Sequence, residues 1–164
     1  MELYTLPQEL SDKIETFISK ERNMESFYKA ASIWCDMNGF KKASKFFVNE
    51  MHGERRHSHK LERFLTDWGV FPTLPQYDIV QPDSFSGLVD IVNKAAEKEY
   101  ELCDLYDKEY VEMGAKNGKV AKLIGCFVKF QQSEVKAYNE RLKILDGCRN
   151  DKFTLLSLSK KLFK

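Results

Sequence analysis

The sequence is poor in residues that interrupt helices. It has 8 glycines and 4 prolines among 164 residues, and three of the prolines, Pro72, Pro75 and Pro82, fall in one short stretch. Long segments therefore contain no helix breaker. This argues against a fold of many β-strands and favours helices.

Long hydrophobic runs are also missing. No segment reaches the roughly 18 consecutive apolar residues that suit a membrane span. The N-terminal sequence MELYTLPQEL has neither the basic nor the apolar region of a secretion signal. We therefore expect a cytoplasmic protein that does not bind membranes.

An excess of one charge and closely spaced cysteines are absent as well. Lys and Arg number 26 and Asp and Glu 25, and this net charge of +1 argues against a dedicated nucleic-acid binder. The four cysteines lack the C-x-x-C spacing of a zinc knuckle or redox pair, which predicts reduced, semi-buried thiols: Cys35, Cys103, Cys126 and Cys148.

Apolar residues recur at alternating spacings of three and four in four long stretches. The pattern predicts one domain over 1–164, with helices over about 7–37, 40–68, 84–113 and 119–146 and a short fifth helix over about 151–163. Asp83 and Ser84 are the predicted cap of the third helix, and Asp151 of the fifth.

The connections between these helices predict the topology. Short turns join the first helix to the second and the third to the fourth, whereas the proline-rich residues 69–83 form one long connection. Two antiparallel hairpins joined by a crossover are typical of an all-α, ferritin-like four-helix bundle.

Polar residues interrupt each apolar stripe at mid-helix, on the face predicted to point inward. They are Glu21 on the first helix, Glu54 and His57 on the second, Glu99 on the third, and Gln131 and Glu134 on the fourth. The two pairs have i, i+3 spacing, which puts both side chains on one helix face. Glu21 and Glu99 precede their pairs by 33 and 32 residues, so the pattern occurs twice.

Four carboxylates in one core require counter-charge, which two divalent cations would supply. Carboxylates with a single imidazole suit iron, manganese or zinc. The alternative is a helical interaction protein without catalysis, in which the carboxylates are hydrogen-bonded in the core. His52 and His59 fall off the stripe and are predicted to lie on the surface, and Glu50 at its edge is left unassigned.

These residues resemble the ferritin family, most of all its bacterial non-haem members, over nearly the whole chain. The matching segments are ERNMESFYKAASIWC from Glu21, Glu54-Arg55-Arg56-His57, FLTDWG from Phe64, KEYE around Glu99, and Gln131-Gln132-Ser133-Glu134.

The resemblance implies a ferroxidase that oxidises Fe²⁺ with O₂ or H₂O₂ at a site for two irons within one subunit. It also implies storage of Fe³⁺ as a mineral inside a hollow homo-oligomer of 24 subunits. By the resemblance, Glu21 and His57 bind the first iron, Glu54 bridges, Glu99 binds the second iron with Glu134 near it, Gln131 supports the centre or its oxygen species, and Tyr28 lies beside the irons. A core tyrosine with a satisfied hydroxyl is the other interpretation of Tyr28.

Departures from the family pattern refine these expectations. Gly53, Phe130 and Ser133 stand where bacterial members carry the carboxylates of a third iron site, so a third site is not expected. Arg55 stands where haem-binding relatives have methionine, which argues against haem. The segment from Leu155 to Leu162 resembles the fifth helix at four-fold contacts of a cage, or packs back on its own chain.

Two further alternatives stay open at this point. A di-metal peroxidase or oxygenase could use the same helices without a hollow assembly. A 12-subunit cage is less favoured, because its metal site normally lies between subunits.

Overall fold

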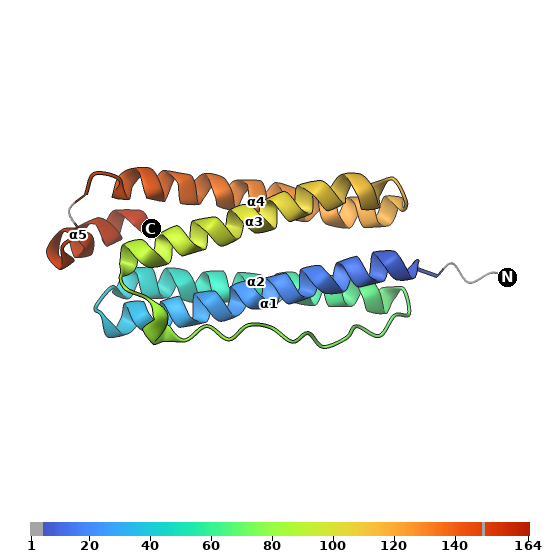
Figure 1. Cartoon of the computed structure of the whole chain (residues 1–164), viewed down its shortest axis with the longest axis horizontal. Helices are drawn as coiled ribbons and strands as arrows, with labels where there is room; N and C mark the ends of the chain where they lie inside the picture. The colour runs from blue at the N-terminus through green and yellow to red at the C-terminus, as the bar shows by residue number, and fades with distance from the viewer. Residues whose placement is uncertain (1–4, 149) are drawn as a thin grey trace. The chain divides into compact units, whose positions relative to one another are not determined.

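The computed structural model describes residues 5–148 and 150–164 (Figure 1). These residues form α1 (Gln8–Met37), α2 (Lys41–Asp67), the 3-10 helix η1 (Pro82–Ser84), α3 (Leu88–Gly114), α4 (Gly118–Leu145) and α5 (Lys152–Leu162). They contain no strand, so the predicted all-α fold with four long helices and a short fifth helix is confirmed. No helix among them combines the length and apolar character needed to cross a bilayer.

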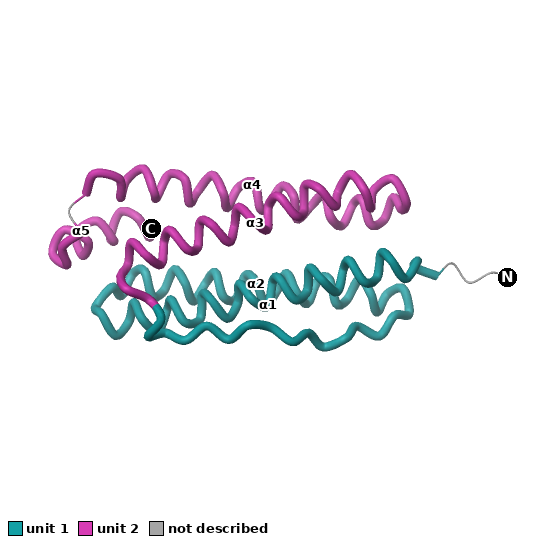
Figure 2. The backbone as a smooth tube through the Cα atoms, viewed as in Figure 1, with its two compact units in different colours: residues 1–84 teal, residues 85–164 magenta. Residues whose placement is uncertain are grey.

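The chain divides into two compact units (Figure 2). Unit 1 covers residues 1–84 and contains α1, α2 and η1, and unit 2 covers residues 85–164 and contains α3, α4 and α5. Each unit is a pair of long antiparallel helices joined by a short turn. The single-domain assignment over 1–164 stays a prediction.

In unit 1, glycines end both long helices at the predicted places. Gly39 has φ +86° and Gly69 φ +72°, in the left-handed region that glycine adopts without a Cβ clash. The Phe40 amide then donates to the Cys35 carbonyl, and the Val70 amide to the Leu65 carbonyl. These bonds satisfy carbonyls at the helix ends and turn the chain sharply.

The crossover, residues 69–81, runs beside α1 without regular structure (Figure 1). Its backbone is held by side chains of α1: the Thr73 amide donates to Glu15 at 2.8 Å, the Asp78 amide to Asn23 at 2.8 Å, and the Val80 amide to Ser26 at 3.0 Å. Polar side chains on α1 thus replace the hydrogen bonds that a helix or strand would supply. The predicted long connection is confirmed.

The predicted start of the third helix is wrong. Asp83 and Ser84 lie in η1, where the Ser84 hydroxyl donates back to the Gln81 carbonyl at 2.7 Å instead of capping a following helix. The cap position of α3 is Gly87, and the Asp90 carboxylate accepts from the Ser86 amide at 3.1 Å. All other helix ends lie within one residue of their predicted positions.

In unit 2, α3 and α4 approach closely near their shared turn. A Cβ built on Gly125 would lie 3.2 Å from the Tyr110 ring, so a larger residue there would push this ring outward by a few tenths of an ångström. The Asn117 side chain caps α4 by accepting from the amides of Lys119 and Val120.

The short helix α5 is capped by Asp151, as predicted, through the Thr154 amide at 2.9 Å. Leu155, Leu162 and Phe163 are buried within the chain itself. Arg141 of α4 donates to the Leu162 carbonyl at 3.3 Å. These contacts favour the interpretation in which the segment packs back on its own chain.

Candidate metal centre

Three predicted site residues of unit 1 come together between α1 and α2. Potential ligand atoms of Glu21, Glu54 and His57 lie within 4.8 Å of one another, and no other such group of three occurs among the described residues. His57 Nδ1 lies 3.2 Å from Glu21 Oε2 and 3.3 Å from Glu54 Oε2.

Helix geometry explains why these side chains meet. Glu21 occupies the buried stripe of α1, while Glu54 and His57 lie one turn apart on the stripe of α2. Glu21 is fully buried, Glu54 is 2% exposed, and the His57 side chain is 16% exposed. The inward orientation predicted for both glutamates is therefore confirmed.

The donor set of this cluster fits a divalent transition metal. Two buried carboxylates are costly without counter-charge, and one imidazole beside them is insufficient to balance both. Carboxylate oxygens with one ring nitrogen suit Fe²⁺, Mn²⁺ or Zn²⁺. The cluster is therefore a candidate metal centre.

In unit 2, Glu99 and Gln131 are also buried, as predicted. Gln131 Nε2 donates to Glu99 Oε2 at 2.7 Å across α3 and α4. Its Oε1 is buried without a hydrogen-bond partner among the described residues. Because a buried acceptor without a donor costs about 1–3 kcal/mol, this oxygen suits a site that receives a metal or its bound water. Glu134, one turn further along α4, is half-buried.

Tyr28 is a fully buried aromatic of the core of unit 1. Its ring stacks on Phe47 with centroids 5.9 Å apart. Tyr106 of unit 2 follows Glu99 by seven residues, as Tyr28 follows Glu21, and is also buried, stacking on Phe127 at 5.2 Å. Packing accounts for both tyrosines equally, and a role for Tyr28 in the reaction stays a prediction.

His52 and His59 are exposed, as predicted. Glu50, which the sequence analysis left unassigned, is half-buried. Among the positions that depart from the family pattern, Ser133 is exposed and Phe130 is 37% exposed.

The four cysteines are free, as predicted, but the expected partial burial is wrong for Cys126, which is exposed. Burial raises the pKa of the Cys35 thiol to about 12, so this thiol stays protonated. Cys103 is also buried, and burial, followed by the charges of Asp107, Asp104 and Glu99, raises its pKa.

A charged network beside the centre was not anticipated from the sequence. Arg22 donates to Glu25 at 2.8 Å and to Glu62 at 3.2 Å, and Arg55 donates to Glu25 at 2.7 Å. Burial alone would raise the pKa of the Glu25 carboxyl, but the hydrogen bonds and charges of the two arginines outweigh it and lower that pKa. The network joins α1 to α2 through residues directly next to Glu21 and Glu54.

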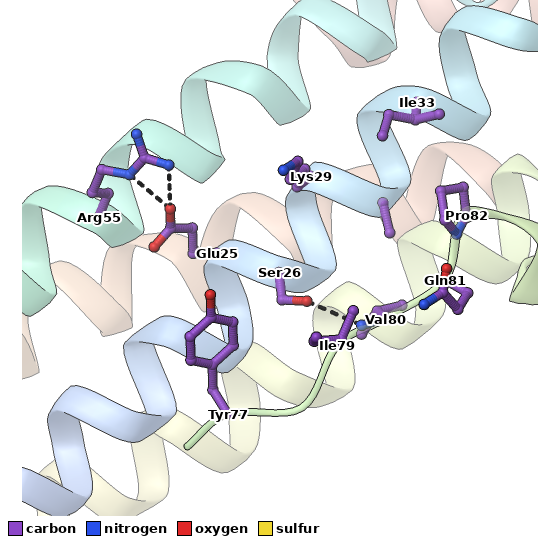
Figure 3. Close-up of a pocket in the computed structure, with 11 residues that line it drawn as sticks. Glu25, Ser26, Lys29, Ile33, Arg55, Tyr77, Ile79, Val80, Gln81 and Pro82 are labelled. Atoms are coloured by element: carbon purple, nitrogen blue, oxygen red, sulfur yellow. Dashed lines mark hydrogen bonds and ion pairs between the residues drawn. The ribbon is translucent and has the colours of Figure 1, made fainter. Parts of the chain in front are cut away.

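A cavity of about 330 Å³ lies between the crossover and α1 (Figure 3). Glu25, Arg55 and Tyr77 are among its lining residues, and none of the predicted site residues lines it. It is therefore separate from the metal centre.

Most of the chain matches a known family. A family model described as the ferritin-like domain matches residues 12–147. The chain belongs to the ferritin family. The matched range includes every predicted site residue, from Glu21 to Glu134. The ferritin family binds iron, and many of its members are ferroxidases. That this chain belongs to the bacterial non-haem subtype stays a prediction. None of the curated proteins that were compared matches it.

Proposed function

We propose that the protein is an iron-storage ferroxidase that oxidises Fe²⁺ to Fe³⁺ and holds the product as a ferric mineral. The observation that supports this most is the buried cluster of Glu21, Glu54 and His57, which lies inside the range matched by the ferritin-like domain. Iron is the substrate of this reaction, and O₂ or H₂O₂ is the oxidant.

The proposed roles follow the donor chemistry of each side chain. Glu21 and His57 hold one Fe²⁺, Glu54 bridges, and Glu99 and Glu134 hold the second Fe²⁺. The bridging role depends on residues of both units and rests on the family resemblance. The free Oε1 of Gln131 accepts a hydrogen bond from bound water or from the oxygen species.

Charge favours both binding and oxidation. Four carboxylates are balanced by two dications, and hard oxygen donors stabilise Fe³⁺ relative to Fe²⁺. Each Fe²⁺ gives up one electron, so two irons supply the electron pair that O₂ or H₂O₂ takes up. Two irons held together thus deliver the pair in one encounter.

Storage requires a hollow assembly, and we propose the 24-subunit homo-oligomer that the family resemblance implies. Sedimentation velocity of the purified protein distinguishes this assembly from a dimer. A dimer or monomer with metal-dependent oxidation of an organic substrate would favour the alternative of a di-metal peroxidase or oxygenase.

The central experiment adds Fe²⁺ aerobically to the purified chain and follows ferric absorbance and particle mass together. We expect rapid oxidation and iron that stays with the large particle. His57→Ala should slow oxidation strongly, whereas His59→Ala, an exposed histidine on the same helix, should not. Oxidation no faster than in buffer would contradict the proposal and favour a non-catalytic helical protein.

A further inference from the structure

Two hydrogen bonds occupy equivalent positions beside the two sets of site residues. Arg22 directly follows Glu21, and its Nη2 donates to Glu62 Oε1 of α2 at 3.2 Å. Tyr100 directly follows Glu99, and its hydroxyl donates to Asn139 Oδ1 of α4 at 2.6 Å. Each bond joins the two long helices of one unit.

The acceptors correspond as closely as the donors. Glu62 follows Glu54 by eight residues, and Asn139 follows Gln131 by eight residues. The bonded pairs are 40 and 39 residues apart. The site residues show the same difference of one residue, because Glu54 follows Glu21 by 33 residues and Gln131 follows Glu99 by 32. The bonds therefore have the same register relative to the site residues.

Antiparallel helices explain this offset. Side chains lean toward the N-terminus of their own helix. Arg22 and Tyr100 therefore lean toward the C-terminal part of the partner helix. Their acceptors, Glu62 and Asn139, lie in that part, eight residues after Glu54 and Gln131. The same geometry operates in both units with different side chains, a charged pair in one and a neutral pair in the other.

Metal binding depends on this register more than folding does. Apolar packing between helices is not directional, whereas a hydrogen bond fixes both distance and angle. A slip of one residue moves a helical side chain by about 1.5 Å, while metal–ligand distances tolerate about 0.2 Å. Loss of a group hydrogen-bonded to a metal ligand typically lowers metal affinity about 10- to 100-fold. A bond that acts through the residue next to a ligand should therefore have an effect at the lower end of this range.

We infer that the Arg22–Glu62 and Tyr100–Asn139 bonds are matched clamps that hold each pair of helices in register for metal binding. Their members are positioning residues, because they act through the neighbouring glutamates. The inference rests on the proposed function, in which Glu21 and Glu99 are metal ligands.

The test measures Co²⁺ binding to the full chain by calorimetry and by visible absorbance. Co²⁺ is chosen because O₂ oxidises it far less readily than Fe²⁺, so binding is measured without the reaction. His57→Ala and Glu99→Ala first assign the binding steps to the two units. We then expect Arg22→Met to weaken only the His57-dependent step and Tyr100→Phe only the Glu99-dependent step, each about tenfold. The melting temperature of each metal-free variant shows whether it is folded.

Matched controls come from the same helices. Tyr110 lies on α3 and is 44% exposed, as Tyr100 is, and Arg63 is an exposed arginine of α2. Tyr110→Phe and Arg63→Met should change neither step by more than about twofold. Glu62→Met, which removes the acceptor oxygen and keeps a similar length, replaces Arg22→Met if that variant does not fold.

The outcomes separate the inference from the proposed function. A wild-type chain that binds no Co²⁺ and oxidises no Fe²⁺ would overturn both. Normal wild-type binding with unchanged affinities in both clamp variants would overturn the clamps alone. Equal weakening of both steps by either variant would also overturn them, because it would indicate general loosening of the fold.

Discussion

The two units share one plan but differ in chemistry beside the site. In unit 1, Glu25 accepts from Arg22 of its own helix and from Arg55 of α2, so charges join the helices. The equivalent of Glu25 in unit 2 is Cys103, which donates weakly to Asp107 of its own helix at 3.9 Å. At this position only unit 1 joins its two helices, whereas unit 2 joins α3 to α4 through the neutral Tyr100–Asn139 bond.

The site residues of the two units also differ in chemistry. Glu54 and His57 of α2 correspond to Gln131 and Glu134 of α4. Unit 1 thus offers two carboxylates and a ring nitrogen, and unit 2 offers oxygen donors. Nitrogen donors suit later transition metals better than purely oxygen donors do. We therefore expect the units to differ in metal preference even though their helices are built alike.

The largest expected effect comes from Glu54→Ala, because Glu54 is the residue proposed to contact both irons. Rapid Fe²⁺ oxidation should fall to the rate seen in buffer. The chain should still fold, because a buried charge is removed. Stopped-flow absorbance measures the rate, and Glu50→Ala, a half-buried glutamate one turn earlier, is the control. Wild-type rates for Glu54→Ala would exclude the bridging role.

The next effect concerns the number of irons. Anaerobic Fe²⁺ titration should saturate near two tight irons per chain. His57→Ala and Glu134→Ala should each lose about one of them, from unit 1 and unit 2 respectively. Gly53, Phe130 and Ser133 supply no carboxylate for a third ion. A third ordered iron next to Gly53 or Ser133 in soaked crystals would contradict this prediction.

Core packing should be equally important in both units. Phe47 stacks on Tyr28 and Phe127 on Tyr106, and both phenylalanines are buried. Each Phe→Ala change should destabilise the chain by about 3–5 kcal/mol through lost burial and a cavity. Denaturant unfolding measures both. A loss below about 1 kcal/mol in only one unit would show that its aromatic pair is not a core element.

Much of the fold was predictable because it is encoded by short-range patterns. The spacing of apolar residues predicted the helices, and glycine predicted their ends, since both depend only on neighbours along the chain. The start of α3 was missed because Ser84 has two competing uses, capping a helix ahead or closing a turn behind. Sequence alone does not decide between these bonds.

The site was predictable where burial carries the signal. Inward positions such as Glu21 and Glu99 stand out because a charge interrupts an apolar stripe. Arg22 and Tyr100 were missed because they lie off the stripe, where polar residues are usual. Aligning the two halves of the pattern offers a signal, since both residues directly follow the inward glutamate. The metal-binding roles, the cage and the cytoplasmic location stay predictions.

The smallest expected effects distinguish, by their pH dependence, the charged network around Glu25 in unit 1 from the neutral Tyr100–Asn139 bond in unit 2. The pKa of Glu25 is lowered below its ordinary value of 4.5. A carboxyl with a lowered pKa stabilises the folded state above pH 4.5, and this contribution is lost as pH falls through the folded-state value. Glu25→Gln should therefore lower the melting temperature by about 2–4 °C at pH 7, corresponding to about 1 kcal/mol. The difference from wild type should shrink below pH 4.5.

Tyr100→Phe breaks a neutral bond, so its smaller difference from wild type should be the same at pH 7 and pH 4. Differential scanning calorimetry of the metal-free proteins measures both. A difference for Glu25→Gln that does not change with pH would show that shape rather than charge holds α1 against α2.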